Sequence, residues 1–170
     1  MRRAPPPPPS PPIVPALAAL LARPVSANVA SCDDAHRPHL TRAIGFRLEP
    51  DQRQLTVFLA QSTSAAVLAD LRANGRIAVV FSEPSTHRTL QVKGAEVFIA
   101  PALADDLAAL HAYWQAFTEE IGTLGFAPRV ARTMLSYPLE DIVGVRFAPQ
   151  TGFDQTPGPR AGEVLASGAS

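Results

Sequence analysis

Three short stretches of this 170-residue chain combine residue types that bind anions. The first is Gln61-Ser62-Thr63-Ser64, which lies where an apolar strand pattern ends and a helical pattern begins. Hydroxyl groups and free amide N–H groups at a helix N-terminus suit an anionic group such as phosphate. An ordinary N-cap explains the same residues, so this stretch by itself leaves both interpretations open.

The second stretch carries Arg42 and Arg47 on one expected strand. A guanidinium group is a good phosphate ligand because it presents several N–H donors in a fixed plane. Residues five positions apart point to opposite faces of a regular strand. Both arginines therefore reach one ligand only if the strand is bulged, and otherwise at least one of them faces solvent.

The third stretch runs from Ser85 to Gly94 and places polar and basic groups, including His87 and Arg88, at the entry to a long strand. Alternation puts Thr89, Gln91 and Lys93 on one face of that strand. Such a face either binds a polar ligand or is solvated.

Other chemistry is not indicated. The sequence has no Gly-rich phosphate loop, no zinc-type spacing of Cys and His, and no nucleophile elbow. His36 and His39 lie close together but lack a third ligand, so we expect no metal site. The acidic pair Asp33-Asp34 suits a turn, and Asp105-Asp106 suits the first turn of a helix.

Composition narrows the class of protein. Fifteen basic and fifteen acidic residues give zero net charge, which disfavours a nucleic-acid partner and favours self-association. The single cysteine, Cys32, cannot form an intramolecular disulfide, and no apolar run reaches membrane-spanning length, so we expect a cytoplasmic protein without a membrane partner. Arg2-Arg3 before an apolar stretch is signal-like, but Pro5 to Pro9 favour a polyproline tail.

The pattern predicts three regions: a disordered proline-rich tail at 1–12, a domain at 13–150 and a flexible tail at 151–170. The domain begins with a short helix at 13–22 that buries Leu17, Leu20 and Leu21. Strands are expected at Val25–Ser31, His39–Leu48 and Gln54–Ala60, joined as two hairpins. A helix then starts near Ser62–Ser64 and ends at Asn74-Gly75.

The second half of the domain contains two further expected strands, Arg76–Phe81 and Thr89–Ile99. The longest helix is expected to start at Pro101 and to present Leu103, Leu107, Leu110, Trp114, Phe117 and Ile121 on one face. A short helix at 128–135 and a strand at Asp141–Ala148 follow. This order is mainly β with added helices (α+β), and it favours a small antiparallel barrel with helices at its ends.

In this order the three stretches resemble the pyridoxamine 5'-phosphate oxidase family of FMN-binding split β-barrels. Arg42 and Arg47 match the spacing of two basic residues in that family, and Gln61–Ser64 falls at its phosphate-binding segment. Asn74–Phe81 resembles the helix end and buried strand, and Arg88–Gly94 resembles the last motif. The resemblance implies an antiparallel split barrel with flanking helices, a homodimer, and FMN at the dimer interface.

The chain departs from the family at three places, one of which is Thr89, which replaces the Gln of the last motif. Ala65-Ala66 replaces the Arg-Lys pair that grips the FMN phosphate, and each lost charge-assisted contact is worth about 1.5–3 kcal/mol. The C-terminal Trp and Arg that help to bind the pyridoxine substrate have no counterpart. We therefore do not expect pyridoxamine 5'-phosphate oxidase activity.

The leading hypothesis is a homodimeric, FMN-dependent oxidoreductase of unknown substrate, in which the flavin supplies the redox chemistry. Its expected cofactor contacts are Arg42, Arg47, Gln61, Ser62, Thr63, Ser64, Arg88, Thr89 and Lys93. The alternatives are a flavin- or haem-binding protein without catalysis, with His87 as the candidate haem ligand, and a dimeric scaffold whose ligand site has decayed.

Overall fold

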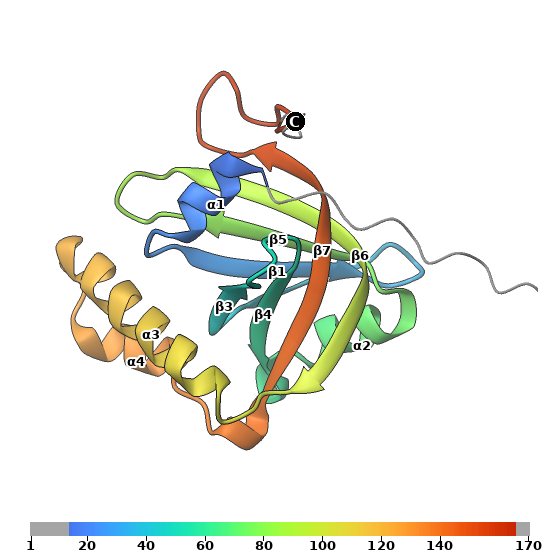
Figure 1. Cartoon of the computed structure of the whole chain (residues 1–170), viewed down its shortest axis with the longest axis horizontal. Helices are drawn as coiled ribbons and strands as arrows, with labels where there is room; N and C mark the ends of the chain where they lie inside the picture. Colours follow the sequence, from blue (N-terminus) through green and yellow to red (C-terminus); the bar gives the residue numbers. More distant parts are fainter. Residues whose placement is uncertain (1–13, 166–170) are drawn as a thin grey trace, which may run out of the picture.

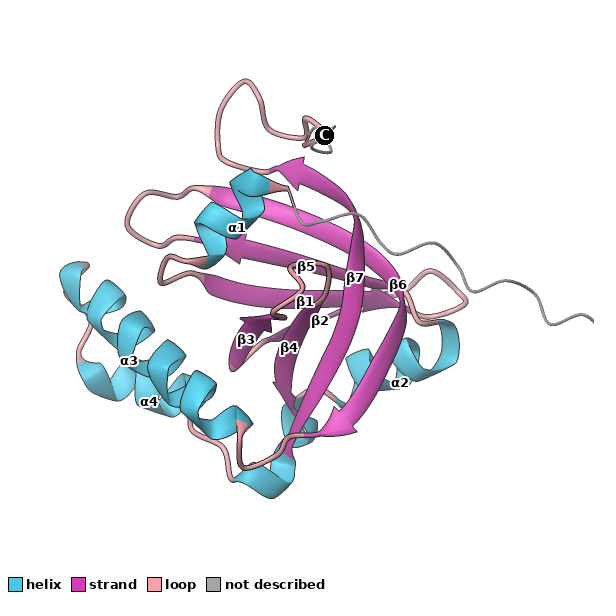
Figure 2. Ribbon diagram, viewed as in Figure 1, coloured by secondary structure: helices cyan, strands magenta, loops and turns pink. Residues whose placement is uncertain are grey.

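The computed structural model describes residues 14–165, and at its centre one antiparallel sheet of seven strands curls into a barrel (Figures 1 and 2). The strands lie in the order β2-β1-β5-β6-β7-β4-β3. They are β1 (Ser26–Cys32), β2 (Pro38–Arg42), β3 (Gly45–Leu48), β4 (Leu55–Ala60), β5 (Ile77–Ser82), β6 (Thr89–Pro101) and β7 (Ile142–Asp154). The predicted antiparallel split barrel with flanking helices is confirmed.

Two long strands hold the two halves of the barrel together. β6 and β7 have 13 residues each, and they pair with one another along most of that length. The first half of β6 also pairs with β5, and the first half of β7 pairs with β4. Each long strand therefore belongs to both halves, which couples them through backbone hydrogen bonds.

The interior of the barrel is apolar. Val29, Val79 and Val92 are in register on β1, β5 and β6, and all three are buried. Their neighbours along each strand point outward, because successive side chains of a strand alternate between faces. The outer face is therefore defined by residues such as Ala30, Ala78 and Lys93.

Helix α1 (Pro15–Leu21) packs against this interior through Leu17, Leu20 and Leu21, as predicted. Burial of each leucine contributes about 1.5–3 kcal/mol. The predicted polyproline tail at 1–12, and Ile13 of the predicted helix, lie outside the described residues.

The strand predicted at His39–Leu48 is wrong, because the chain forms two strands there. β2 pairs with β1, whereas β3 pairs with β4. Between them Ala43 donates its N–H to Ala27 and Ile44 donates its N–H to Phe58, so the backbone changes partner at this point. Both side chains are buried, in two different apolar clusters, and this burial holds the corner.

Helix α2 (Ala65–Asn74) follows β4 through the one-turn helix η1 (Gln61–Thr63). It ends where the sequence predicts. Gly75 has a φ of +68° and donates its N–H to the Leu71 carbonyl, a left-handed cap that glycine adopts without strain.

Helices α3 (Asp106–Thr123) and α4 (Pro128–Leu135) form a hairpin beside the barrel (Figure 1). They share a second apolar cluster, which includes Leu110, Phe117 and Leu135. The predicted helix start at Pro101 is wrong, because β6 continues to that residue. The next residues turn, and Leu103 on this turn is 66 % exposed.

The predicted strand end at Ala148 is also wrong. After the short helix η2 (Leu139–Asp141), β7 continues to Asp154, since its second half pairs with the start of β6, for example Thr151 with Lys93. Residues 151–154 of the expected C-terminal tail therefore lie in the sheet. Val164 forms a bridge with Phe153, and residues 166–170 lie outside the described part.

Within residues 14–165, every helix is too short or too polar to cross a membrane.

Candidate functional site

The outer face of β2, β1, β5 and β6 gathers part of the predicted site. Arg42, Asn28, Val80 and Gln91 lie in one cross-strand row. Ala30, Ala78 and Lys93 lie in the next row. Thr89 lies at the start of β6 on the same face. Arg42 and Gln91 are three strands apart, roughly 14 Å between their backbones at the usual strand spacing.

A cavity of about 490 Å³ lies on this face, at the end of β1 that carries Cys32. Its floor is built from small side chains, among them Ala30, Ala78 and Ala95, together with Gly94. The register of β6 against β7 shifts after Lys93, which makes a bulge there. The floor therefore leaves room for a flat ligand to approach the backbone.

Two cations border the cavity. The Lys93 ammonium lies 5.1 Å from the centre of the Phe153 ring. Arg76 follows Asn74-Gly75 directly, and no carboxylate of the described chain lies in ion-pair range of either cation. They are free to pair with an anionic ligand.

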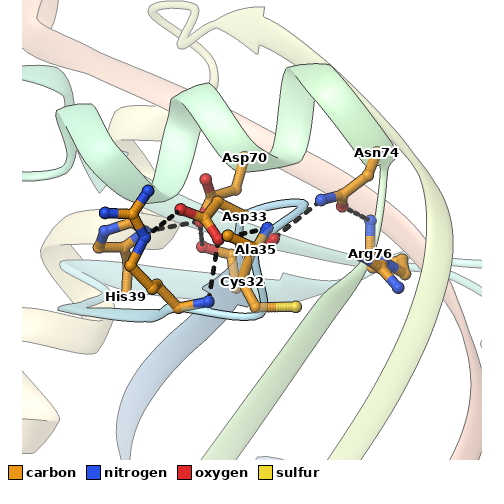
Figure 3. Close-up of polar contacts among 9 residues, drawn as sticks. Cys32, Asp33, Ala35, His39, Asp70, Asn74 and Arg76 are labelled. Carbon is orange, nitrogen blue, oxygen red and sulfur yellow. Dashed lines mark hydrogen bonds and ion pairs between the residues drawn. The ribbon is translucent and has the colours of Figure 1, made fainter.

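A polar network positions this end of β1 (Figure 3). The buried Asp70 carboxylate accepts hydrogen bonds from Ser31 Oγ at 2.7 Å and is 2.8 Å from His39 Nδ1. Asn74 Nδ2 donates to the Cys32 carbonyl at 2.8 Å, and Asn74 Oδ1 accepts from the Arg76 N–H at 2.9 Å. Hydrogen bonds from His39 and Ser31 lower the pKa of Asp70. The network fixes α2 to the hairpin of β1 and β2.

The residues at the start of α2 already have partners. Ser62 donates its N–H to Asp141 Oδ1 at 2.9 Å and its hydroxyl to Asp141 Oδ2 at 2.5 Å. Ser64 Oγ lies 2.9 Å from Thr41 Oγ1, in a buried contact. Gln61 and Thr63 bond to the backbone carbonyls of Glu140 and Ala60. A phosphate at this segment has to displace the Asp141 carboxylate from Ser62.

Arg47 is also engaged. Its guanidinium pairs with Glu49 and with Asp106 at the start of α3. Burial lowers the pKa of Arg47, but the hydrogen bonds that Arg47 donates to Asp106 and Glu49 outweigh burial and raise it. Arg42 lies on β2, which pairs with β1, whereas Arg47 lies on β3, which pairs with β4. The two arginines therefore do not form a joint site within one chain.

Arg88 and His87 lie on the exposed loop between β5 and β6. His87 has a φ of +60° and donates its backbone N–H to Glu83. Thr89 Oγ1 donates to the His87 carbonyl at 3.0 Å and lies 2.7 Å from Ser82 Oγ. Only Lys93 of the predicted residues borders the 490 Å³ cavity.

Arg42 borders a different, smaller cavity of about 280 Å³ next to α3 and α4. One guanidinium nitrogen, Nη1, is buried without a hydrogen-bond partner among the described residues, and so is the Tyr113 hydroxyl. Burial raises the pKa of Tyr113, and the nearby Arg42 charge opposes that rise.

The part of the chain that the structure describes contains no group of three His, Cys, Asp or Glu side chains placed to hold a metal ion. His39, one of the two histidines considered for a metal, is bonded to Asp70.

No protein-family model matches the sequence, and no curated protein matches it either. Solved structures do match its fold. HupZ of Group A Streptococcus has a TM-score of 0.54 and 18 % identity, covering 88 % of this chain and 99 % of HupZ. An F420 reductase has a TM-score of 0.52 and 18 % identity, with coverages of 79 % and 93 %.

A third match is a candidate pyridoxamine 5'-phosphate oxidase from Lactobacillus delbrueckii, with a TM-score of 0.52 and 10 % identity, covering 83 % of this chain and 93 % of that one. The chain has the split-barrel fold of pyridoxamine 5'-phosphate oxidase-like proteins. At these identities the likeness concerns the fold, and function has to be argued from the site.

The split-barrel fold raises the question of whether these residues suit FMN. The 490 Å³ cavity suits it, because a planar ring can lie on the small-residue floor while Lys93 and Arg76 supply positive charge. The start of α2 suits it less, because Ala65 and Ala66 add no charge and Asp141 holds Ser62. The sequence did not single out Arg76 as a ligand, although its position directly after a glycine-capped helix end was visible.

Proposed function

We propose that this protein is a homodimeric, FMN-binding split barrel that carries out a flavin-dependent oxidoreduction and is not a pyridoxamine 5'-phosphate oxidase. The observation that carries the proposal is the cavity with a small-residue floor and two cations without carboxylate partners, Lys93 and Arg76. The matches to an F420 reductase and to a candidate pyridoxamine 5'-phosphate oxidase support a redox cofactor on this fold.

In this proposal Lys93 and Arg76 hold the phosphate, and Ala30, Ala78 and Gly94 let the ring approach the sheet. A bound flavin would supply the electron or hydride transfer. The lining of the cavity contains no Asp, Glu or His, so the protein's part is binding, orientation and exclusion of water. Since the cavity is open on the outer face, the second subunit would cover it.

The first test is the visible absorption spectrum of the purified protein, recorded before and after incubation with FMN, FAD or haemin and removal of free ligand. We expect a retained flavin spectrum, followed by oxidation of NADH or NADPH. A protein that retains no flavin contradicts the proposal.

Lys93 is the only lysine in the chain, which gives a second readout. Acetylation with an amine-reactive ester modifies Lys93 and the N-terminal amine, and bound FMN should protect Lys93. Lys93→Gln should weaken FMN binding about 10- to 100-fold through loss of a charge-assisted contact. Arg72→Gln on α2 is the matched control and should leave the affinity unchanged.

The variant Ser62→Ala with Ser64→Ala distinguishes the two phosphate positions. If this variant weakens FMN binding and Lys93→Gln does not, the phosphate binds at the start of α2, as the sequence resemblance implies, and our placement is wrong.

A second candidate function is a dimeric scaffold whose ligand site has decayed. The Asp141 carboxylate bound to Ser62, next to Ala65-Ala66, favours it. A dimer that retains neither flavin nor haemin would support this function. A retained Soret band would instead favour haem binding, with His87→Ala as the test of its ligand.

A further inference from the structure

The cavity beside Arg42 is separate from the proposed flavin site. It lies between Ser26 and Arg42 on the outer sheet face, Pro84 on the loop after β5, and the α3–α4 hairpin. It therefore occupies the Ser26 end of β1, whereas the larger cavity occupies the Cys32 end. Six of its lining residues come from or follow α3 or lie on α4, and all six are apolar: Phe117, Ile121, Leu124, Phe126, Val130 and Met134.

Arg42 is the one charged residue that lines this cavity. Its Nη1 atom is buried and has no acceptor within the described residues. A buried charged donor without an acceptor is unfavourable, and such groups are rare in folded proteins unless a ligand, ion or water completes them. An anion in the cavity would pair with the Arg42 guanidinium that lines it.

Tyr113 provides a second unsatisfied donor nearby. Its side chain is 8 % exposed, and its hydroxyl is buried without a partner in the described chain. It is close enough to Arg42 for the guanidinium charge to act on it. Tyr113 does not line the cavity itself, so Arg42 is the polar group that a ligand in the cavity would meet.

The rim of the cavity also lacks a cover. Leu124 is 46 % exposed and Phe126 is 52 % exposed, although both are apolar and line the cavity. An apolar ligand body would remove part of this surface from water, which is favourable. With one guanidinium and no second cation in the lining, the charge of the site matches a monoanion better than a phosphate dianion.

We propose that this cavity binds a small apolar carboxylic acid, whose carboxylate pairs with Arg42 and whose hydrocarbon part lies against Pro84 and the α3–α4 side chains. This site goes beyond the proposed flavin function and does not depend on it.

Calorimetric titration of the full-length protein with octanoate tests the proposal. Octanoate should bind, whereas acetate, which lacks the apolar body, and octylammonium, which has the opposite charge, should not bind measurably. Octanol should bind at least about 10-fold more weakly than octanoate, because it cannot form the charge-assisted pair with Arg42.

Variants locate the site. Arg42→Gln should weaken octanoate binding about 10- to 100-fold, and Met134→Trp should abolish it by filling the cavity. Arg129→Gln, an exposed arginine of the same helical hairpin, is the matched control and should bind octanoate as the wild type does.

Circular dichroism checks that each variant is folded. If Arg42→Gln does not fold, the proposal is tested by Met134→Trp and by the comparison of octanoate with octanol. The proposal is overturned if octanoate does not bind, if octanol binds equally well, or if both cavity variants bind like the wild type. Flavin retention is measured separately on the same preparations, so failure of the flavin proposal leaves this result interpretable.

Discussion

Asp70 illustrates how a single buried carboxylate can organise the region around a site. It lies on α2, is buried, and accepts a hydrogen bond from Ser31 of β1. It also contacts His39 of β2 (Figure 3). Hydrogen bonds to the ionised form favour that form, which is why the pKa of Asp70 is lowered. Because the native pKa lies below the unfolded one, the ionised carboxylate stabilises the folded state.

The lowered pKa of Asp70 predicts that its contribution to stability depends on pH. The contribution of Asp70 is present above the unfolded pKa, which is about 4 for aspartate, and is lost as the pH falls through the lowered native value. Asp70→Asn should therefore be less stable than the wild type at pH 7, and the difference should shrink toward about pH 3. Urea unfolding at several pH values measures it.

Asp34→Asn, at an exposed position of the same hairpin, is the control and should unfold like the wild type at every pH. A stability difference between Asp70→Asn and the wild type that stays constant with pH would contradict the assignment.

At the scale of elements, the close pairing of β6 with β7 depends on Gly94. The strand register shifts at this residue, and a Cβ added here would lie 2.6 Å from Phe147 Cδ2 and 2.7 Å from the Ala148 carbonyl oxygen. The carbonyl belongs to the backbone of the neighbouring strand and cannot rotate away. Close packing of the two strands, rather than a special backbone conformation, is what requires glycine.

Gly94→Ala should lower the free energy of unfolding by about 1–3 kcal/mol, because the added methyl group overlaps Phe147 and the backbone of β7. Gly122→Ala on α3 is the matched control. A Cβ at Gly122 meets nothing within 4 Å, so this variant should gain about 0.5–1 kcal/mol from helix propensity. Chemical denaturation of both variants tests the contrast, and equal effects of the two substitutions would refute it.

At the scale of the whole molecule, the outer face of β2, β1, β5 and β6 leaves apolar residues exposed or half-buried beside polar ones such as Gln91 and Lys93. Leu40 on β2 is 71 % exposed and lies in register with Ala30. Exposed apolar surface beside a cavity is typical of an interface between proteins. Together with zero net charge, it favours a second copy of this chain as the partner.

We predict that the wild type has twice the mass of one chain in solution and that Leu40→Glu is monomeric. Since Leu40 is exposed, the substitution should change the free energy of unfolding of one chain by less than about 0.5 kcal/mol. Leu103→Glu, at a position that is 66 % exposed before α3, should remain dimeric. Light scattering after size exclusion measures all three. A monomeric wild type, or a dimeric Leu40→Glu, would show that this face is not the interface.

The sequence alone determined the elements whose signals are local. The apolar face of α1, the Asn74-Gly75 end of α2, the helix at 128–135 and the alternation along β6 all depend on neighbours a few residues apart. Hydrophobic period and capping therefore predicted them. The resemblance carried by Arg42, Gln61–Ser64 and Arg88–Gly94 also predicted the split barrel correctly.

Only the tertiary structure decided which side chains share a site. The break between β2 and β3 sends Arg42 to one cavity and Arg47 to Asp106, and the approach of η2 brings Asp141 to Ser62. Each of these outcomes depends on residues that are far apart in the sequence. The local sequence pattern indicated which residues have side chains that bind anions. Long-range strand pairing and packing decided which of these residues are free to bind a ligand.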